Sequence, residues 1–212
     1  MDNRISLKGC SAISRALEHN EALHTLVLDY NDIGDEGATT LSVGVSWNPT
    51  LSTLSMKYCK IGEEGGVAVG TLIVAKSPSL TDLDLQGNSI GNRGLLAIAE
   101  GLRNSPKLSK LNLSSTSTGG VVELQTIDKL CEGIMENKNT LTDLNLHLNS
   151  ISDEGAKSLL DLVQKKPTLI RLKLYEQLNK DLFKQICEVV TKNKIASAKK
   201  SKPARKVKKK EP

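Results

Sequence analysis

Leucines recur along the chain in a pattern that is repeated six times. The most complete copies, at residues 23–33, 80–90 and 141–151, follow the motif L-x-x-L-x-L-x-x-N-x-I. The first leucines of successive copies are separated by 28, 29, 28, 33 and 28 residues, and the last copy is degenerate. These leucines are Leu23, Leu51, Leu80, Leu108, Leu141 and Leu169. Self-similarity at this period is typical of a solenoid in which each repeat forms one supersecondary unit.

Each repeat contains signals for one strand and one helix. The L-x-L alternation predicts a short strand that directs two leucines inward. Apolar residues at helical spacing follow, as at Leu95, Ile98 and Leu102. In four of the repeats a proline lies two residues before the first leucine of the next copy, where it ends the helix. We therefore expect an α/β solenoid of about six repeats, with a curved parallel sheet on the concave side and helices on the convex side. The strands are expected around Leu26, Leu54, Leu83, Leu111, Leu144 and Leu172.

The segment between strand and helix carries its own signature. An Asn or Cys stands where the chain leaves the strand, and a buried Asn there can bond backbone groups of the bend and of the neighbouring repeat. The sequence Ile-Gly-Asp-Glu-Gly follows at residues 33–37, with variants at 61–65 and 151–155. Its acids, such as Asp35, are expected to complement the exposed N–H groups of the helix that they begin. Its second glycine is expected to let the helix pack close to the strand layer.

These segments, with a full helix in each unit, resemble the ribonuclease-inhibitor class of leucine-rich repeats. That class includes parts of NOD-like receptors, the Ran GTPase-activating protein, tropomodulins and several ciliary proteins. The resemblance covers about residues 3–190. It implies a non-enzymatic protein-binding or scaffold module, in a cytoskeletal or ciliary assembly. Because a fold does not fix a function, the particular partner must be argued from the surface.

The beginning of the chain departs from the pattern. Residues 3–20 align with residues 31–48 at a constant offset of 28, so the sequence starts inside a repeat, with a helix but without its strand. Two interpretations remain open. The start is a fragment or a degenerate helical cap, or the N-terminal repeat has an open edge that a partner contacts.

The fourth repeat is longer than its neighbours by five residues. The extra material lies around residues 114–120, a stretch of Ser, Thr and Gly. Insertions in solenoids map to one face and often contact partners, whereas a tolerated surface loop is the alternative.

Charge divides the chain into a repeat domain, residues 1–195, and a basic tail, residues 196–212. Residues 192–212 hold ten Lys or Arg and one acid, whereas residues 1–191 hold 19 basic and 23 acidic residues. The tail is expected to be disordered. It is a solubilising end, a nuclear-import signal, a nucleic-acid or ribonucleoprotein contact, or an attachment to an acidic protein surface. The residues expected to make such contacts are Lys199, Lys200, Lys202, Arg205, Lys206, Lys208, Lys209 and Lys210.

Polar side chains are expected in columns on the concave face. One column alternates in charge, and it is expected to neutralise itself. It contains Asp82, Lys110, Asp143 and Arg171. Asp29 is expected to be the exposed charge of the first strand. Tyrosines also fall on this surface or its rim, where they serve as binding anchors or shield a repeat edge. The residues predicted to contact a protein partner are Tyr30, Lys57, Tyr58, Asp84, His147, Lys173 and Tyr175.

Nothing in the sequence predicts catalysis, a cofactor or a metal site. The histidines lie in separate repeats without a nucleophile pattern, and the four cysteines are far apart and are expected to be buried apolar residues. A GTPase-activating function of the Ran-activator type is an alternative for which only Asn92 and Arg93 match. The polar start and the lack of a long apolar run predict a cytoplasmic protein without a signal peptide or membrane span, and cytoskeletal and nuclear locations also remain open.

Overall fold

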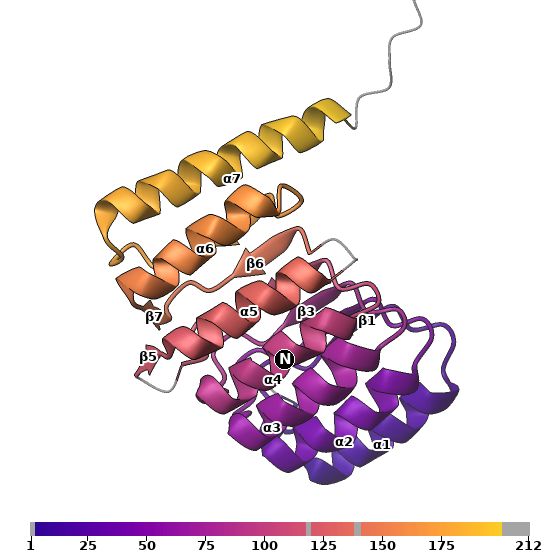
Figure 1. The fold of residues 1–212 in the computed structure, drawn as a ribbon. Helices are drawn as coiled ribbons and strands as arrows, with labels where there is room; N and C mark the ends of the chain where they lie inside the picture. The colour runs from indigo at the N-terminus through magenta and orange to yellow at the C-terminus, as the bar shows by residue number, and fades with distance from the viewer. Residues whose placement is uncertain (1–2, 118–119, 138–140, 201–212) are drawn as a thin grey trace, which may run out of the picture.

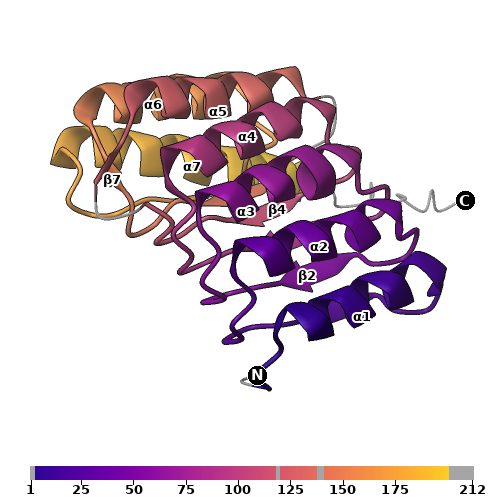
Figure 2. The same ribbon diagram turned by 90° about the horizontal axis from the view of Figure 1, so that it is seen from below.

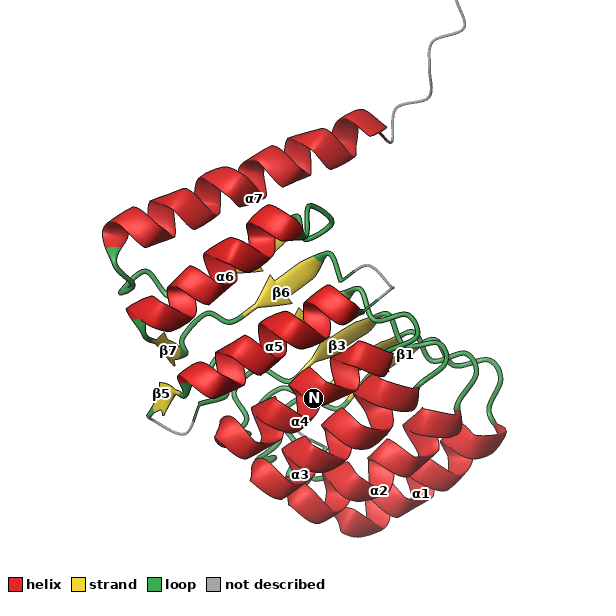
Figure 3. Ribbon diagram, viewed as in Figure 1, coloured by secondary structure: helices red, strands yellow, loops and turns green. Residues whose placement is uncertain are grey.

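The chain forms a solenoid in which helices and strands occupy separate layers (Figure 1). The structure, a computed structural model, describes residues 3–117, 120–137 and 141–200. Figure 2 shows the helices side by side in one layer and the strands along the other, and Figure 3 distinguishes the two by colour. The helices are α1 (Leu7–His19), α2 (Gly34–Trp47), α3 (Glu63–Ala68), η1 (Val69–Val74), α4 (Gly91–Asn104), α5 (Leu124–Glu136), α6 (Asp153–Lys165) and α7 (Lys180–Lys200).

The main sheet is parallel, as the leucine pattern predicted. Its six strands are paired in the order β1-β2-β3-β4-β6-β8, so neighbours in space are successive repeats. The inward leucines are in register from strand to strand, beginning with Leu26 opposite Leu54. The strands are β1 (Thr25–Val27), β2 (Thr53–Ser55), β3 (Asp82–Asp84), β4 (Lys110–Asn112), β6 (Asp143–Asn145) and β8 (Arg171–Lys173). The predicted α/β solenoid is therefore confirmed.

The bends between strand and helix are of two alternating kinds. In the first, the amide of Gly34 or Gly91, both with φ of +62°, donates to the backbone carbonyl of Cys59 or Thr116 in the next repeat. In the second, the side chain of an asparagine in the next repeat forms hydrogen bonds with the backbone of the bend instead. The Asn88 carbonyl accepts from the amides of Cys59 and Ile61, and its NH₂ group donates to the carbonyls of Met56 and Leu85.

Asn149 serves the bend after Thr116 in the same way. Asn31 likewise accepts from the amides of Asn3 and Ile5, so residues 3–5 form the bend of a repeat whose helix is α1. The predicted alignment of this segment with residues 31–48 is thus confirmed. Each asparagine satisfies buried backbone groups of two repeats at once, which couples neighbouring repeats through polar contacts as well as through leucines.

One acid of the Ile-Gly-Asp-Glu-Gly segment acts on a different helix from the one expected. The Asp35 carboxylate accepts from the amides of Gly62 and Gly65, at 2.6 and 3.0 Å, and so caps the start of α3 in the next repeat. Only the stacking of one repeat on another brings the carboxylate to these amides. In α6 the cap is local, because the Ser152 hydroxyl accepts from the Gly155 amide.

A single extra residue in the second repeat is absorbed inside its helix. The spacing from Leu51 to Leu80 is 29 residues instead of 28, and the helix of this repeat changes from α-helical to π-helical winding at Val69–Val74. A π segment places one more residue in a turn, so it keeps the flanking turns in register with neighbouring helices.

The longer fourth repeat adds a small second sheet. Two-residue strands β5 (Val121–Val122) and β7 (Ser150–Ile151) pair in parallel beside the starts of α5 and α6. The insertion expected around residues 114–120 therefore ends in a strand that joins the fourth repeat to the fifth. Residues 118–119 lie outside the described residues.

Helix α7 closes the C-terminal end of the solenoid in the view of Figure 1 and packs against α6 and β8. Ile186 is its buried contact with the core, and Leu182 and Phe183 are partly buried against it. The helix continues to Lys200 and so includes the first five residues, 196–200, of the expected tail. Of the predicted tail contacts, Lys199 and Lys200 therefore belong to α7. The others, Lys202 to Lys210, lie outside the described residues.

The four cysteines differ in accessibility, and this yields a prediction. Cys10, Cys59 and Cys131 are buried, whereas Cys187 on α7 is exposed. Burial raises the pKa of Cys59 to about 11 and that of Cys131 to about 12. Because the thiolate is the reactive form, we expect one fast-reacting thiol in the native protein at pH 8 and four after unfolding in urea. Titration with a chromogenic disulfide reagent measures this, and a fast phase that survives Cys187→Ser would contradict it.

The same pKa values give the direction of a pH effect. A thiol pKa raised above the unfolded value of about 8.5 favours the folded state at lower pH. That contribution is lost as the pH rises from about 8.5 toward the folded-state values. The melting temperature is therefore expected to fall over this alkaline range, less steeply in a Cys131→Ala variant measured against its own value at pH 7.

Candidate protein-binding surface

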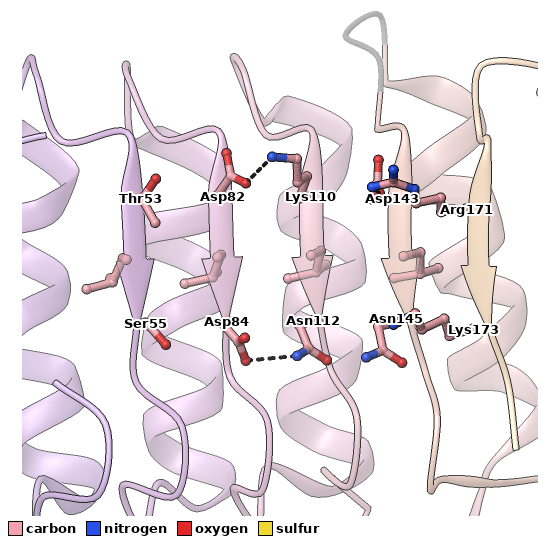
Figure 4. A pocket seen from close by; sticks show the side chains of 14 residues that line it. Thr53, Ser55, Asp82, Asp84, Lys110, Asn112, Asp143, Asn145, Arg171 and Lys173 are labelled. Carbon is pink, nitrogen blue, oxygen red and sulfur yellow. Dashed lines mark hydrogen bonds and ion pairs between the residues drawn. The ribbon is translucent and has the colours of Figure 1, made fainter. Parts of the chain in front are cut away.

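The concave face of the sheet carries a shallow groove of about 340 Å³ that spans β2 to β8. Its outward side chains come from the first and third residues of each strand, on either side of an inward leucine (Figure 4). This alternation follows from the pleat of a strand. The columns predicted from the sequence therefore lie side by side on one surface.

The first column is charged and paired within itself. Lys110 Nζ lies 2.6 Å from an Asp82 carboxylate oxygen, and Arg171 donates to Asp143 at 2.9 Å. The hydrogen bond and charge of Asp82 raise the pKa of Lys110. The predicted self-neutralisation is therefore present as two separate ion pairs. A partner that approaches this column meets alternating charges with a fixed order rather than a field of one sign.

The second column is mainly a network of amides and carboxylates. Asn112 donates to the Asp84 carboxylate at 3.0 Å and to the Gln86 side chain at 3.3 Å. The backbone amide of Gln86 donates to the same Asp84 oxygen. Asp84 is thus held in one orientation on the open face, with Lys173 at the far end of the column on β8.

Asp29 does not lie on the open surface as expected. It is only 1% exposed, because the Ser55 hydroxyl and the Lys57 amide donate to one carboxylate oxygen and Lys57 Nζ lies 3.3 Å from the other. Lys57 Nζ also lies 4.0 Å from Asp84. Burial lowers the pKa of Lys57, and the charges of Asp29 and Asp84 outweigh this and raise it. Asp29 therefore orients Lys57 instead of offering its own charge to a partner.

Two tyrosines stack at the rim where the strands of the first two complete repeats end. The rings of Tyr30 and Tyr58 are 5.0 Å apart and nearly parallel, and they are 51% and 40% exposed. The Tyr58 hydroxyl accepts from the Gln86 amide at 3.0 Å. A side chain on Gly87 would overlap the Tyr58 ring, so this glycine leaves room for the stack.

Both tyrosines have left-handed backbone, with φ of +60° and +51°. Gly87, Ser115 and Leu148 occupy the same position in later repeats with φ between +53° and +72°. A bulky residue in this conformation costs roughly 1–2 kcal/mol, which glycine avoids. The chain thus carries exposed aromatic rings at positions where its own backbone favours glycine, and such outliers point toward a function.

A second aromatic pair lies toward the other end of the rim. The rings of His147 and Tyr175 meet edge to face at 5.7 Å. They belong to neighbouring repeats of the sheet, because they follow β6 and β8. Four of the seven predicted contact residues therefore form two aromatic pairs, Asp84 and Lys173 line the groove, and Lys57 contacts Asp29.

Sequence reasoning missed some of this surface. Ser55, Gln86 and Asn112 fix the charged residues in place, yet their sequence positions only show that they are polar and face outward. It also passed over Trp47 on the convex side, which is 74% exposed. The sequence did contain a signal for this exposure. Alignment of the repeats places Trp47 at the position of His19 in α1 and of Lys76 just after η1, and both of these residues are exposed to solvent.

No group of three His, Cys, Asp or Glu that would suit a metal ion occurs among the described residues. In the described part of the chain, no helix has the length and apolar character needed to cross a membrane. The histidine in the groove region, His147, faces an aromatic ring.

The repeats are similar in sequence to those of known proteins. The Leucine Rich repeat family model matches residues 19–42, 48–70, 76–99 and 137–160. Human NACHT, LRR and PYD domains-containing protein 12 is 28% identical over 160 residues, or 74% of the chain. Mouse ribonuclease inhibitor is 34% identical over 90 residues, or 42% of the chain. The chain spans only 14% and 19% of the lengths of these two proteins.

Solved structures show the same fold. The match to leiomodin-1 actin-binding site 2 has a TM-score of 0.57 and 12% identity, and it covers 88% of this chain and 90% of that one. The match to the tropomodulin C-terminal domain of Caenorhabditis elegans has a TM-score of 0.56 and 11% identity, and it covers 92% and 96% of the two chains. At such identities the likeness concerns the arrangement of helices and strands.

Proposed function

We propose that this chain, a leucine-rich repeat protein of the ribonuclease-inhibitor type, is a non-enzymatic module that binds another protein through its concave face. The observation that carries the proposal is the stacked pair Tyr30 and Tyr58, in left-handed backbone in the bends that follow β1 and β2. Tyrosine is enriched at interface positions that dominate binding energy. A conformational cost at two adjacent exposed rings is explained when a partner packs on them.

The groove suits a partner with charges of both signs. Asp84 and Lys57 are oriented by neighbours, so they are ready to pair without further ordering of the surface. Lys173 and Arg171 make the β8 end more basic than the centre. A partner segment that places an acidic group near β8 and a basic group near Asp84 would match this order of charges.

A cytoskeletal partner, with actin as the first candidate, is the most specific form of this proposal. It is supported by the likeness in fold to the leiomodin-1 actin-binding site 2 and to tropomodulin. GTPase activation of the Ran-activator type has weaker support. Its two matching residues have partners within the solenoid, since Asn92 accepts from the Glu123 amide and Arg93 is paired with Glu64.

The test uses glycine at the tyrosine positions, because glycine removes the ring and keeps the left-handed backbone. The full chain, a Tyr30→Gly/Tyr58→Gly variant and a Ser115→Gly control would be titrated against monomeric actin by fluorescence anisotropy and against filaments by co-sedimentation. Ser115 has the same backbone conformation, with φ of +53°, and no ring. We expect the double variant to bind at least about tenfold more weakly, or about 1.4 kcal/mol, with the control unchanged.

Two results would count against the proposal. If neither form of actin binds, actin is not the partner. If the control loses as much affinity as the double variant, the rings do not carry the interaction. Melting curves of all three proteins should coincide or shift upward for the glycine variants, which separates lost contacts from lost folding.

The basic tail is proposed to add electrostatic attraction without a part in folding. Deletion of residues 201–212 removes six Lys or Arg and one Glu. We expect circular dichroism and melting temperature to stay unchanged. Retention on immobilised heparin should fall to lower salt, because fewer counterions are released on binding. A loss of helical signal larger than the removal of twelve residues can account for would show that the tail stabilises the repeats.

The free edge of β1 is a further proposed contact. Among the described residues β1 pairs with β2 alone, and Val27 and Leu23 beside its edge are exposed. An unpaired strand edge is a template for another chain. The outward amides of Thr25–Val27 are therefore expected to exchange with deuterium quickly in the isolated chain and slowly in a native complex. Full protection in a dilute monomer would exclude this contact.

A further inference from the structure

The convex face contains one segment that differs from the rest. From α4 onward, outward residues of the helices form ion pairs such as Arg103 with Glu132 and Lys165 with Asp161. The outward stripe of α2, in contrast, begins with the exposed Glu36 and after it contains only uncharged residues, Thr39, Val43 and Trp47. These three residues are exposed, with Trp47 at 74%. A fully presented tryptophan beside an exposed valine is unusual on a solvent face and marks an interaction surface.

The neighbouring helix extends this uncharged surface. Segments α3 and η1 pack against α2, and their outward residues between the two ends are Val67, Thr71 and Leu72. Acids lie at the start of this helix, with Glu63 and Glu64, and a base lies just after η1, at Lys76. The surface is thus apolar in the middle, acidic at one end and basic at the other.

We propose that this surface, defined by Thr39, Val43, Trp47, Thr71 and Leu72, binds a second copy of the same chain. The spacing within α2 supports a two-fold arrangement, because Thr39 and Trp47 are each four residues from Val43. Four residues correspond to about 6 Å along a helix and return to the same face. A two-fold axis that lies in the interface and crosses α2 at Val43 therefore sets two α2 helices antiparallel. It places each Trp47 ring over the small Thr39 side chain of the other copy.

The same axis satisfies the charges. When each helix faces its own copy in the antiparallel sense, Lys76 of one chain comes toward Glu63 and Glu64 of the other, where Glu64 also pairs with Arg93 of its own chain. Two-fold interfaces are self-complementary in this way, since each contact occurs twice. The concave face and its groove are on the opposite side of the repeats, so both copies keep their groove open.

A cross-linking experiment tests the position of the axis. In the full chain with Cys187→Ser, which removes the exposed thiol, Val43→Cys places two thiols at the axis, whereas Thr39→Cys places them on either side of it. Under mild oxidation we expect Val43→Cys to form a disulfide-linked dimer and Thr39→Cys to form no such link. A mixture of Thr39→Cys with Trp47→Cys should form the mixed dimer. Equal cross-linking of Val43→Cys and Thr39→Cys, or none of Val43→Cys, would overturn the proposal.

A second measurement needs no introduced cysteine. Trp47 is the only tryptophan, so its emission reports on this surface directly. We expect the emission to shift to shorter wavelength between about 1 and 300 μM protein as sedimentation shows a dimer, and both changes to be absent in a Val43→Glu variant. Met135→Glu on α5, also exposed, is the matched control and should dimerise like the wild type. An emission and a mass that stay those of the monomer throughout would overturn the proposal without affecting the concave-face function.

Discussion

Gly101→Ala is expected to destabilise the solenoid by about 2–4 kcal/mol, although the same change in an ordinary helix interior stabilises by up to about 1 kcal/mol. A side-chain carbon at Gly101 would lie 2.3 Å from the Gly70 carbonyl oxygen and 3.3 Å from Val74 Cβ. The first of these is a backbone atom of the adjacent helix and has no rotamer to change. Segments α4 and η1 must therefore separate by most of an ångström, and dispersion contacts along their whole interface weaken.

The measurement is urea unfolding followed by circular dichroism, with a matched glycine as control. In Gly9→Ala the new carbon meets side-chain atoms of Ile5 alone, Cγ2 at 2.9 Å and Cβ at 3.8 Å, and this partly exposed side chain can shift by rotation about χ1. That variant is expected to be neutral or slightly more stable. If both alanine variants gain stability, the helices tolerate wider spacing than the close backbone approach indicates.

The register of the fold was predictable from sequence because each rule acts within one repeat. Alternating leucines specify a strand, helical spacing specifies the outer helix, and the period sets the parallel pairing. The end of α7 was not predictable from composition. Residues 196–200 are rich in Lys and Ala, which favour both a charged tail and a continued helix.

The concave surface has features that rules acting within one repeat do not predict. Outward columns follow from the pleat, so the positions of Asp82, Lys110 and their neighbours could be predicted. The burial of Asp29 could not, because it depends on Ser55 and Lys57 of the next repeat. The stacking of Tyr30 on Tyr58 also depends on a left-handed backbone that the residue types at these two positions do not predict.

The alternation of the bends was present in the sequence but needs the structure to be interpreted. Asn31, Asn88 and Asn149 stand at the strand exit in every second repeat, with Cys59 and Thr116 between them. The Cys59 thiol donates to the Leu28 carbonyl of the preceding repeat, and the Thr116 hydroxyl donates to the Leu113 carbonyl of its own repeat. The asparagines accept as well as donate, so they hold the bends that lack a glycine in left-handed conformation.

Asn88→Ala is therefore expected to cost about 3 kcal/mol, which lowers the melting temperature by roughly 6–12 °C for a domain of this size. The Asn88 side chain is 2% exposed and makes four hydrogen bonds, to the amides of Cys59 and Ile61 and the carbonyls of Met56 and Leu85. Alanine leaves buried donors and acceptors in two repeats without this partner, and each unsatisfied group costs about 1–3 kcal/mol before the bend relaxes.

Two variants give this prediction its control. Asn104→Ala, at the exposed end of α4, loses an amide of the same kind and is expected to change stability by less than about 0.5 kcal/mol. Asn88→Thr should fall between wild type and Asn88→Ala. Its hydroxyl can donate to the Leu85 carbonyl as Thr116 does to Leu113, but it cannot reach both amides of the preceding bend. Thermal melts in the order wild type, threonine, alanine would show that the asparagine acts as an acceptor across the repeat boundary. Threonine and alanine variants of equal stability would restrict its role to its own repeat.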